Sequence, residues 1–451
     1  MGDPKAFMTI PRQEAGHRPV HERICDFSEV EQTLSESERR KQASRCMDCG
    51  VPFCHWACPL GNKQPEWQDA LYRGDWKFAW QLLSATNDFP EFTGRICPAL
   101  CEKSCTLNHC IDAPVTIREN ECSIVEKAFS EGYAVPRTWP RNGKKVAVIG
   151  GGPSGLSTAV RLNALGYEVT VYDKMAKAGG LVRYGIPNFK LDKFIIDRRI
   201  KFMEDEGIHF VTDCFVDCAK ALPEGYDAYV IATGTPVARD LKIPGRELEG
   251  IYFALQMLTQ QNEILEGQKF AEKDRVSAKG RKVLVIGGGD TGSDCIGTCH
   301  RQEAVSVTQI EILPKPPEGY NPATPWPAWP VILKTTTSHE EGCERRWCLT
   351  SNYFIGDENG RVKGVEVERV EWEPAPDGGR PQMKRTGEKE IIECDMVLLA
   401  MGFLRPEHPA YAENVFLAGD AKNGASLVVR AIASGRETAR QVDAYLKGKK
   451  K

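Results

Sequence analysis

Two strand–turn–helix units with glycine-rich turns limit the possible folds of this 451-residue chain more than any other feature. The first begins at residue 144 with KKVAVIGGGPSG, continues as LSTAVRLNALG and leads into YEVTVYD. The second begins at residue 281 with RKVLVIGGGDTG, continues as SDCIGTCHRQ and leads into AVSVTQIEIL. A buried apolar strand that runs through a glycine turn into a helix is typical of doubly wound sheets that bind nucleotides. The chain is therefore predicted to contain two α/β nucleotide-binding domains.

The first glycine turn has the pattern of a dinucleotide site. Its first glycine allows the tight turn, the second lets the backbone approach a pyrophosphate, and the third permits close packing of helix on strand. An acidic residue ends the following strand, near the position expected of a carboxylate that binds a ribose. A glycine turn that binds no ligand is the alternative. The predicted contacts are Gly150, Gly152, Pro153, Ser154, Gly155 and Asp173.

The second turn repeats this pattern, with Glu311 at the end of its second strand. A carboxylate there favours NAD, whereas nearby Arg or Lys favours NADP through its 2′-phosphate. Several basic residues follow this unit in the sequence, including Arg345 and Arg346. Residue positions alone therefore do not decide between the two coenzymes. The predicted contacts are Gly287, Gly289, Asp290, Thr291, Gly292, Arg301 and Lys315.

A third nucleotide-binding signal lies near the C-terminus, in NVFLAGDAKNGASLVVRAIASGR. The predicted strand ends at Gly419 and Asp420, and a helix follows a short loop. Asp420 is expected to bind a ribityl hydroxyl or the pyrophosphate region, and the helix N-terminus to face the carbonyl edge of a flavin. An ordinary helix cap is the alternative. The contacts predicted at this helix start are Ser426, Leu427 and Val428.

Ten of the 17 cysteines lie before residue 145, most of them in two compact runs. CMDCGVPFCHWACP has the spacing C-x2-C-x4-C-x3-C-P, and CPALCEKSC follows from residue 97. The first spacing is close to the ferredoxin run C-x2-C-x2-C-x3-C-P, whose fourth cysteine ligates a second cluster in two-cluster ferredoxins. Zinc sites and disulfides are the alternatives. Packed cysteines beside two nucleotide folds predict iron–sulfur clusters that transfer electrons.

The number of cysteines in these runs predicts one ligand of another origin. Two four-iron clusters need eight ligands, four for each, and the runs supply seven: Cys46, Cys49, Cys54, Cys58, Cys97, Cys101 and Cys105. By analogy with ferredoxins, Cys58 is expected to serve a different cluster from the cysteines before it. The candidates for the eighth ligand are Cys25, His109, Cys110, Glu121 and Cys122.

The composition indicates a globular protein, with 41% hydrophobic and 27% charged residues. A net charge of −3 gives no indication of nucleic-acid binding or of a basic membrane anchor. The N-terminal residues lack the apolar core of a signal peptide, and no apolar run approaches the roughly 20 residues of a membrane span. A cytoplasmic location is therefore expected, where stable disulfides are uncommon.

Together these stretches resemble the small (β) subunits of NADPH-dependent glutamate synthases and a wider family of NADPH oxidoreductases with FAD and [4Fe-4S] clusters. The likeness covers nearly the whole chain and includes GGLVRYGIPNFKLDK, IATGT, EILPKPP and LAMGF. It implies an N-terminal α-helical cluster domain followed by two Rossmann-like domains, with the NADPH domain inserted in the FAD domain. The implied boundaries are 1–143 for the cluster domain, 144–240 and 403–451 for the FAD-binding parts, and 241–402 for the NADPH-binding domain.

The resemblance also implies individual ligands. One cluster would bind Cys46, Cys49, Cys54 and Cys105, and the other would bind Cys58, Cys97, Cys101 and Glu121. No catalytic side chain is implied, because hydride transfer to a flavin requires positioning and electrostatics from the protein. The further implied cofactor contacts are Gly180, Leu181, Lys190, Thr233, Gly234 and Gly402.

The chain departs from the family pattern at one place. Only AYAE separates Pro409 from the strand that begins at Asn414, where relatives carry a further stretch. This segment connects the NADPH domain to the second FAD-binding part. The shortening is therefore expected to affect the local packing and the retention of FAD.

The expected function is that of an electron-input subunit. NADPH would reduce FAD, and the clusters would pass single electrons to a separate large, FMN-containing subunit that makes glutamate from glutamine and 2-oxoglutarate. One alternative is an input module for another redox partner, such as a ferredoxin:NADP or sulfide-linked oxidoreductase. Another is a binding protein that keeps these folds without electron transfer.

Overall fold

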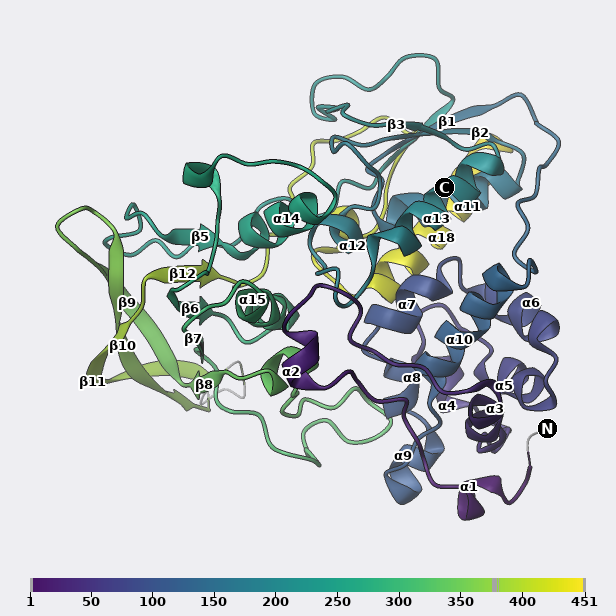
Figure 1. Ribbon diagram of the computed structural model, residues 1–451. Coiled ribbons are helices and arrows are strands. Elements are labelled where there is room, and N and C mark those ends of the chain that lie inside the picture. The colour runs from purple at the N-terminus through teal and green to yellow at the C-terminus, as the bar shows by residue number, and fades with distance from the viewer. Residues whose placement is uncertain (1–2, 375–378, 380, 449–451) are drawn as a thin grey trace.

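The computed structural model describes residues 3–374, 379 and 381–448, and its chain forms three adjacent parts (Figure 1). A helical part contains the N-terminus, a parallel sheet with covering helices follows, and a second parallel sheet lies beside both. In this described part of the chain, no helix combines the length and the apolar character that crossing a membrane requires.

The helical part packs around buried Trp67, Leu71, Leu83 and Ile124. Its helices begin and end at recognisable signals. A capping box between Ser35 and Glu38 begins α3, and a left-handed glycine ends α5. The elements are α1 (Ala6–Thr9), α2 (Val20–Arg23), α3 (Glu36–Ser44), α4 (Phe53–Ala57), α5 (Gln64–Arg73), α6 (Trp76–Thr86), α7 (Pro90–Ile96), α8 (Leu100–Lys103), α9 (Thr106–Ile111) and α10 (Ile117–Ser130).

The first parallel sheet has the strand order β13-β4-β1-β2-β3. Its strands are β1 (Lys145–Ile149), β2 (Glu168–Tyr172), β3 (His209–Val211), β4 (Ala228–Ile231) and β13 (Val415–Leu417). Its helices are α11 (Pro153–Ala164), α12 (Leu181–Tyr184), α13 (Lys193–Asp205), α17 (Asp420–Asn423) and α18 (Val428–Leu446). The last strand of this sheet, β13, follows all strands of the second sheet in the sequence. The predicted insertion of one domain in the other is therefore confirmed.

The second parallel sheet has the order β5-β12-β6-β7-β8. Its strands are β5 (Ile251–Phe253), β6 (Lys282–Ile286), β7 (Ser306–Glu311), β8 (Glu344–Trp347) and β12 (Met396–Leu399). Its helices are α14 (Ala254–Leu265), the 3-10 helix η1 (Glu272–Asp274), α15 (Asp290–Arg301) and α16 (Thr337–Glu340). The limits predicted for the domains stay predictions, but both glycine-rich units form parallel sheets as expected.

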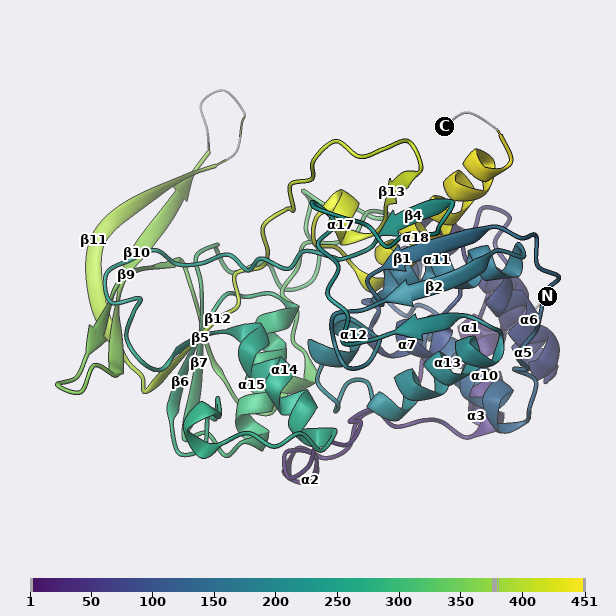
Figure 2. The same cartoon turned by 90° about the horizontal axis from the view of Figure 1, so that it is seen from above.

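A three-stranded antiparallel sheet, order β11-β10-β9, was not expected from the sequence. Its strands are β9 (Leu349–Gly356), β10 (Val362–Glu373) and β11 (Gln382–Glu393). Figure 2 shows it projecting at the end of the molecule that lies away from the helical part. The alternating residues of VKGVEVERVEWE were the available signal, because period-2 alternation is typical of a half-buried strand.

Buried ion pairs connect the three parts. Glu341, just after α16, binds Arg301 of α15 and also Arg23 of α2, whose helix lies against this domain in Figure 1. Glu91 of α7 binds Arg199 of α13, so the helical part and the first sheet are also joined. The relative positions of the domains are thus set by charges that are withdrawn from water.

Candidate functional site

Four of the predicted cysteines line one cavity in the helical domain, and the rest of its wall is largely apolar. They come from separate segments: Cys46 follows α3, Cys49 lies in the next loop, Cys54 belongs to α4, and Cys105 precedes α9. In the described residues, no three His, Cys, Asp or Glu side chains are grouped as they would be around one metal ion. Thiols that surround a space fit a cluster with several iron atoms, whose ligation by these residues stays a prediction.

The other predicted set also comes together. Burial raises the pKa of the Cys101 thiol, and the neighbouring Cys58, Cys97 and Glu121 act in the same direction. Burial likewise raises the pKa of Cys97 to about 12, with Glu121 and Cys58 among its charged neighbours. Because iron ligands must be deprotonated, these raised pKa values indicate thiols that depend on a bound cation for their ionised form.

Glu121 is 7% exposed and lies among polar groups that position its carboxylate. Asn87 donates to Oε1 at 3.1 Å, Asn62 donates to Oε2 at 3.4 Å, and the Thr93 hydroxyl also donates to Oε1. Burial raises the pKa of Glu121 to about 8. The Glu121 carboxyl is thus buried and held by three side-chain donors, and its role as the eighth ligand stays a prediction.

The other four candidates for the eighth ligand lie in different surroundings. Cys25 and Cys110 are exposed, and the charged neighbours of Cys122 are Arg95 and nearby acidic residues. His109 stacks on Trp326 with their ring centroids 4.6 Å apart. Of the five candidates, the structure thus groups Glu121 with Cys58, Cys97 and Cys101.

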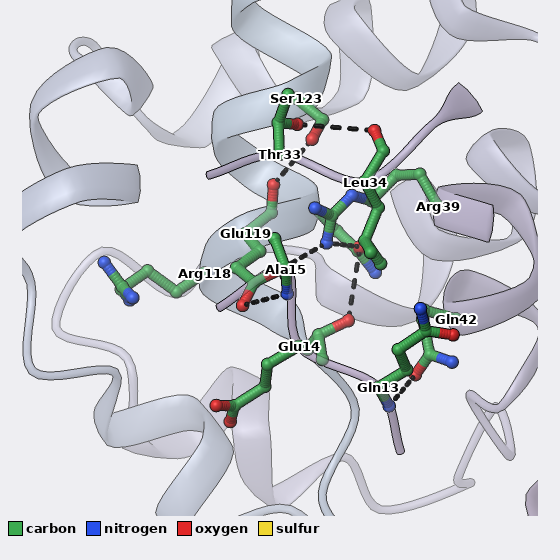
Figure 3. A network of polar contacts seen from close by, with 12 residues as sticks. Gln13, Glu14, Ala15, Thr33, Leu34, Arg39, Gln42, Arg118, Glu119 and Ser123 are labelled. Atoms are coloured by element: carbon green, nitrogen blue, oxygen red, sulfur yellow. Dashed lines mark hydrogen bonds and ion pairs between the residues drawn. The ribbon is translucent and has the colours of Figure 1, made fainter. Parts of the chain in front are cut away.

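The helix that carries Glu121 is held from the N-terminal segment. Figure 3 shows Glu119 of α10 between the Ala15 backbone, whose N–H donates to it, and Arg39 of α3. Asn120 accepts from the same guanidinium and donates to Gln68 at 2.8 Å. These contacts fix the rotation of α10 and therefore the direction of the next side chain, Glu121.

The residues predicted to bind the first dinucleotide gather at the carboxyl ends of β1, β2, β4 and β13. Gly150 has φ +109°, and a Cβ there would lie 2.4 Å from the Ala232 carbonyl oxygen, so the turn requires glycine. Asp173 accepts the Gly151 N–H at 2.8 Å and the Met175 N–H at 2.9 Å. Ligands bind outside the carboxyl ends of strands in open α/β sheets, which is where this group lies.

Two helices direct uncapped N-termini into this region. Neither α11 nor α18 has a side-chain cap, so their first N–H groups remain available for an anion. Asp420 accepts the Ser426 hydroxyl at 2.6 Å beside the start of α18. The remaining predicted contacts, Pro153, Ser154, Gly155, Gly180, Leu181, Thr233, Gly234, Gly419, Leu427 and Val428, lie in α11, in the turns after these strands and at the starts of α12 and α18. This arrangement fits the pyrophosphate of FAD.

The second unit repeats the arrangement at β6, α15 and β7. Gly287 has φ +125°, and α15 begins at Asp290 and Thr291 without a side-chain cap. Glu311 accepts the Gly288 N–H at 2.6 Å and the Leu313 N–H at 3.2 Å. Gly402 follows β12 at the same edge of the sheet. The geometry fits a second dinucleotide.

Three of the residues predicted to contact a cofactor form ion pairs with other residues of the chain. Lys190 forms an ion pair with Asp294 of α15 at 2.6 Å, so it bridges the two nucleotide domains. The guanidinium of Arg301 is buried, binds Glu341 and lies 3.8 Å from the Phe189 ring centroid. Lys315 pairs with Glu318 at 2.7 Å. Their roles in cofactor binding stay predictions.

Two glycine substitutions in the second turn are expected to have different effects, one on coenzyme binding and the other on stability. At Gly289, with φ −83°, a Cβ would have nothing within 4 Å, whereas at Gly292 it would lie 2.4 Å from the Gly287 carbonyl oxygen. We expect Gly289→Ala to keep its stability and to weaken coenzyme binding at least about tenfold, because the pyrophosphate must approach this backbone. Gly292→Ala should lower the free energy of unfolding by about 1–3 kcal/mol. Calorimetric binding and urea unfolding test the pair, and normal coenzyme affinity in Gly289→Ala would contradict the assignment.

Comparison with known proteins identifies the families that parts of this chain match. Residues 23–133 match the family described as dihydropyrimidine dehydrogenase domain II, 4Fe-4S cluster, and residues 144–324 match the pyridine nucleotide-disulphide oxidoreductase family. FprA from Mycobacterium tuberculosis, solved in complex with NADPH, has a TM-score of 0.54 and 17% identity, and the match covers 69% of this chain and 87% of FprA. At that identity the likeness shows the fold alone.

Two curated relatives extend over nearly the whole chain. The glutamate synthase (NADPH) small chain of Mycobacterium tuberculosis is 43% identical, with 99% of this chain and 97% of the relative covered. The glutamate synthase (NADH) of Schizosaccharomyces pombe is 40% identical over 99% of this chain and 23% of its own length. The first alignment spans 480 positions against 451 residues here, so it contains about 30 positions at which this chain has no residue. The shortening predicted after Pro409 stays a prediction. The chain therefore belongs to the family of glutamate synthase (NADPH) small chains.

Proposed function

We propose that this chain is the electron-input subunit of a glutamate synthase, a pyridine nucleotide oxidoreductase that takes electrons from NADPH. The main support for this proposal is that one chain combines two dinucleotide-binding sheets with two groups of four potential cluster ligands. The names of its small-chain relatives agree with this activity and do not favour an input module for a ferredoxin or sulfide-linked partner.

The residues of this chain would bind, position and shield the cofactors. The uncapped starts of α11 and α18 hold FAD, and the start of α15 holds the nicotinamide coenzyme. When bound, FAD accepts two electrons as hydride and the clusters carry single electrons. The Lys190–Asp294 ion pair keeps the two nucleotide domains in register, and the apolar wall around Cys46 and Cys105 excludes water from one cluster. This chemistry requires no acid or base from the protein.

The electron acceptor is proposed to be a separate large subunit that contains FMN. The Schizosaccharomyces pombe relative supports this partner, since a chain like this one matches only 23% of that glutamate synthase. The location is proposed to be the cytoplasm. All 17 cysteines are free in the structure, as is usual where disulfides are not stable.

An anaerobic pull-down with cofactor analysis tests the proposed partner. The tagged chain should bring down one large subunit that contains FMN, and the complex should form glutamate from glutamine and 2-oxoglutarate with NADPH or NADH as the electron donor. Recovery of a ferredoxin-type protein without any FMN-containing chain would show that the chain serves another acceptor. The untagged chain is the control for proteins that bind the resin.

A further inference from the structure

A buried glutamine of α5 lines the cavity that Cys46 and three other predicted ligands surround. Gln68 is 0% exposed, and its Oε1 accepts a hydrogen bond from Asn120 of α10 at 2.8 Å. Its Nε2 is withdrawn from water and has no hydrogen-bond partner among the described residues. Buried amide donors are nearly always hydrogen-bonded, because a lost hydrogen bond to water is costly. This N–H therefore indicates an acceptor that the polypeptide does not supply.

The direction of the Gln68 amide follows from a guanidinium, which can only donate. Arg39 of α3 donates to Asn120 Oδ1 at 3.2 Å, and the Thr116 hydroxyl donates to the same oxygen at 3.3 Å. Asn120 must therefore turn its NH2 group toward Gln68, which presents its oxygen in return. Arg39 is itself held by Glu119 at 2.8 Å (Figure 3). The NH2 group of Gln68 is thus the end of an anchored chain of hydrogen bonds.

The rest of the cavity wall limits what the acceptor can be. Apart from the thiols it is formed mainly by apolar side chains such as Phe53 and Leu107, and the Thr106 hydroxyl already accepts from Cys49 at 3.6 Å. The sulfur atoms of an iron–sulfur cluster accept N–H donors, and these hydrogen bonds help to set the reduction potential of the cluster. Such a bond is stronger in the reduced state, because that state carries one more negative charge.

We propose that Gln68 donates a hydrogen bond to a sulfur atom of the cluster predicted in this cavity and thereby raises the reduction potential of that cluster. The inference rests on the proposed function, because it concerns a cluster of the same electron path. Gln68 lies outside the eight predicted ligands, so it tunes the cluster and does not hold it. The electron transfer itself is unchanged and requires no further reactant.

A redox titration followed by EPR tests this role on the purified protein with its clusters. Gln68→Met keeps the length of the side chain and removes the donor. We expect one of the two cluster signals to move to a lower midpoint potential. The ratio of reduced to oxidised cluster at a fixed potential should fall about tenfold, which corresponds to about 59 mV for one electron. The other signal and the iron content should stay unchanged.

Gln64→Met is the matched control on the same face of α5. Gln64 is also buried and lines the same cavity, but its atom without a partner in the described part of the chain is the carbonyl oxygen Oε1. Burial raises the pKa of the Cys58 thiol, and a hydrogen bond from Gln64 is among the contacts that act in the opposite direction. Gln64 thus serves the other group of ligands. The signal that moves in Gln68→Met should keep its midpoint potential in Gln64→Met.

A second measurement does not depend on the folding of Gln68→Met. In reduced Gln64→Met protein with ¹⁵N-labelled glutamine side chains, pulsed EPR should detect a ¹⁵N coupling to one cluster. Unchanged midpoint potentials of both signals in Gln68→Met would overturn the inference, and so would the absence of this coupling. A purified protein that binds no iron would contradict the proposed function instead, so the two failures are distinguishable.

Discussion

Replacement of Glu121 by alanine is expected to remove one of the two clusters and to leave the other in place. Glu121 is a charged neighbour of Cys58, Cys97 and Cys101, whereas Cys46 and three other cysteines line a separate cavity. Loss of one ligand leaves three for a four-iron cluster, so iron should fall from about eight to about four atoms per chain. Iron analysis and the EPR spectrum of the reduced protein measure this change.

Cys110→Ser is the matched control for Glu121→Ala. Cys110 is another candidate for the eighth ligand, but it is exposed. Its replacement should preserve the iron content and both EPR signals. An unchanged pair of clusters in Glu121→Ala, together with a loss in Cys110→Ser, would transfer the ligand role to the cysteine.

Replacement of Glu341 by alanine is expected to lower the free energy of unfolding by about 3–5 kcal/mol. Its carboxylate is completely buried and binds both Arg23, at 2.8 Å, and Arg301, at 2.7 Å. Both guanidinium groups are also buried, so the substitution leaves Arg301 without its carboxylate partner and Arg23 with only the half-exposed Glu340, in a region of low dielectric. The midpoint of urea unfolding measures the loss.

The neighbouring Glu340 supplies the control. It also contacts Arg23, at 3.1 Å, but 47% of its side chain is exposed. Exposed ion pairs contribute little, so Glu340→Ala should cost less than about 1 kcal/mol. Equal losses in the two variants would show that the buried network around Glu341 does not hold the N-terminal segment to this domain.

The glycine turns were predictable because their requirements are local. Gly150 and Gly287 adopt positive φ in the structure. A Cβ at either position would lie too close to a backbone carbonyl oxygen, at 2.4 Å for Gly150 and 2.3 Å for Gly287. The strand before, the helix after and the acidic residue at the end of the next strand follow in order along the sequence. Short-range rules were therefore enough to predict both glycine turns and the strands and helices around them, whereas the insertion of one domain in the other was implied by the family resemblance.

Contacts between distant segments were not predictable in this way. Arg301 was predicted as a cofactor contact, and nothing in the sequence indicated its buried ion pair with Glu341, which lies 40 residues further on. Lys190 was implied to be a cofactor contact, and its ion pair with Asp294 of the other nucleotide domain had no signal in the sequence. The sheet β9–β11 was missed because alternation within a strand does not identify the strand that pairs with it. These features depend on how the domains meet.

Anaerobic titration of the purified chain with NADH or NADPH tests most directly whether the chain passes electrons from a nicotinamide coenzyme through FAD to its clusters. We expect a coloured protein with about one FAD and about eight iron atoms, whose flavin absorbance bleaches and whose clusters then give EPR signals. A colourless protein, with no bound flavin or iron and no coenzyme-dependent reduction of a dye, would contradict it.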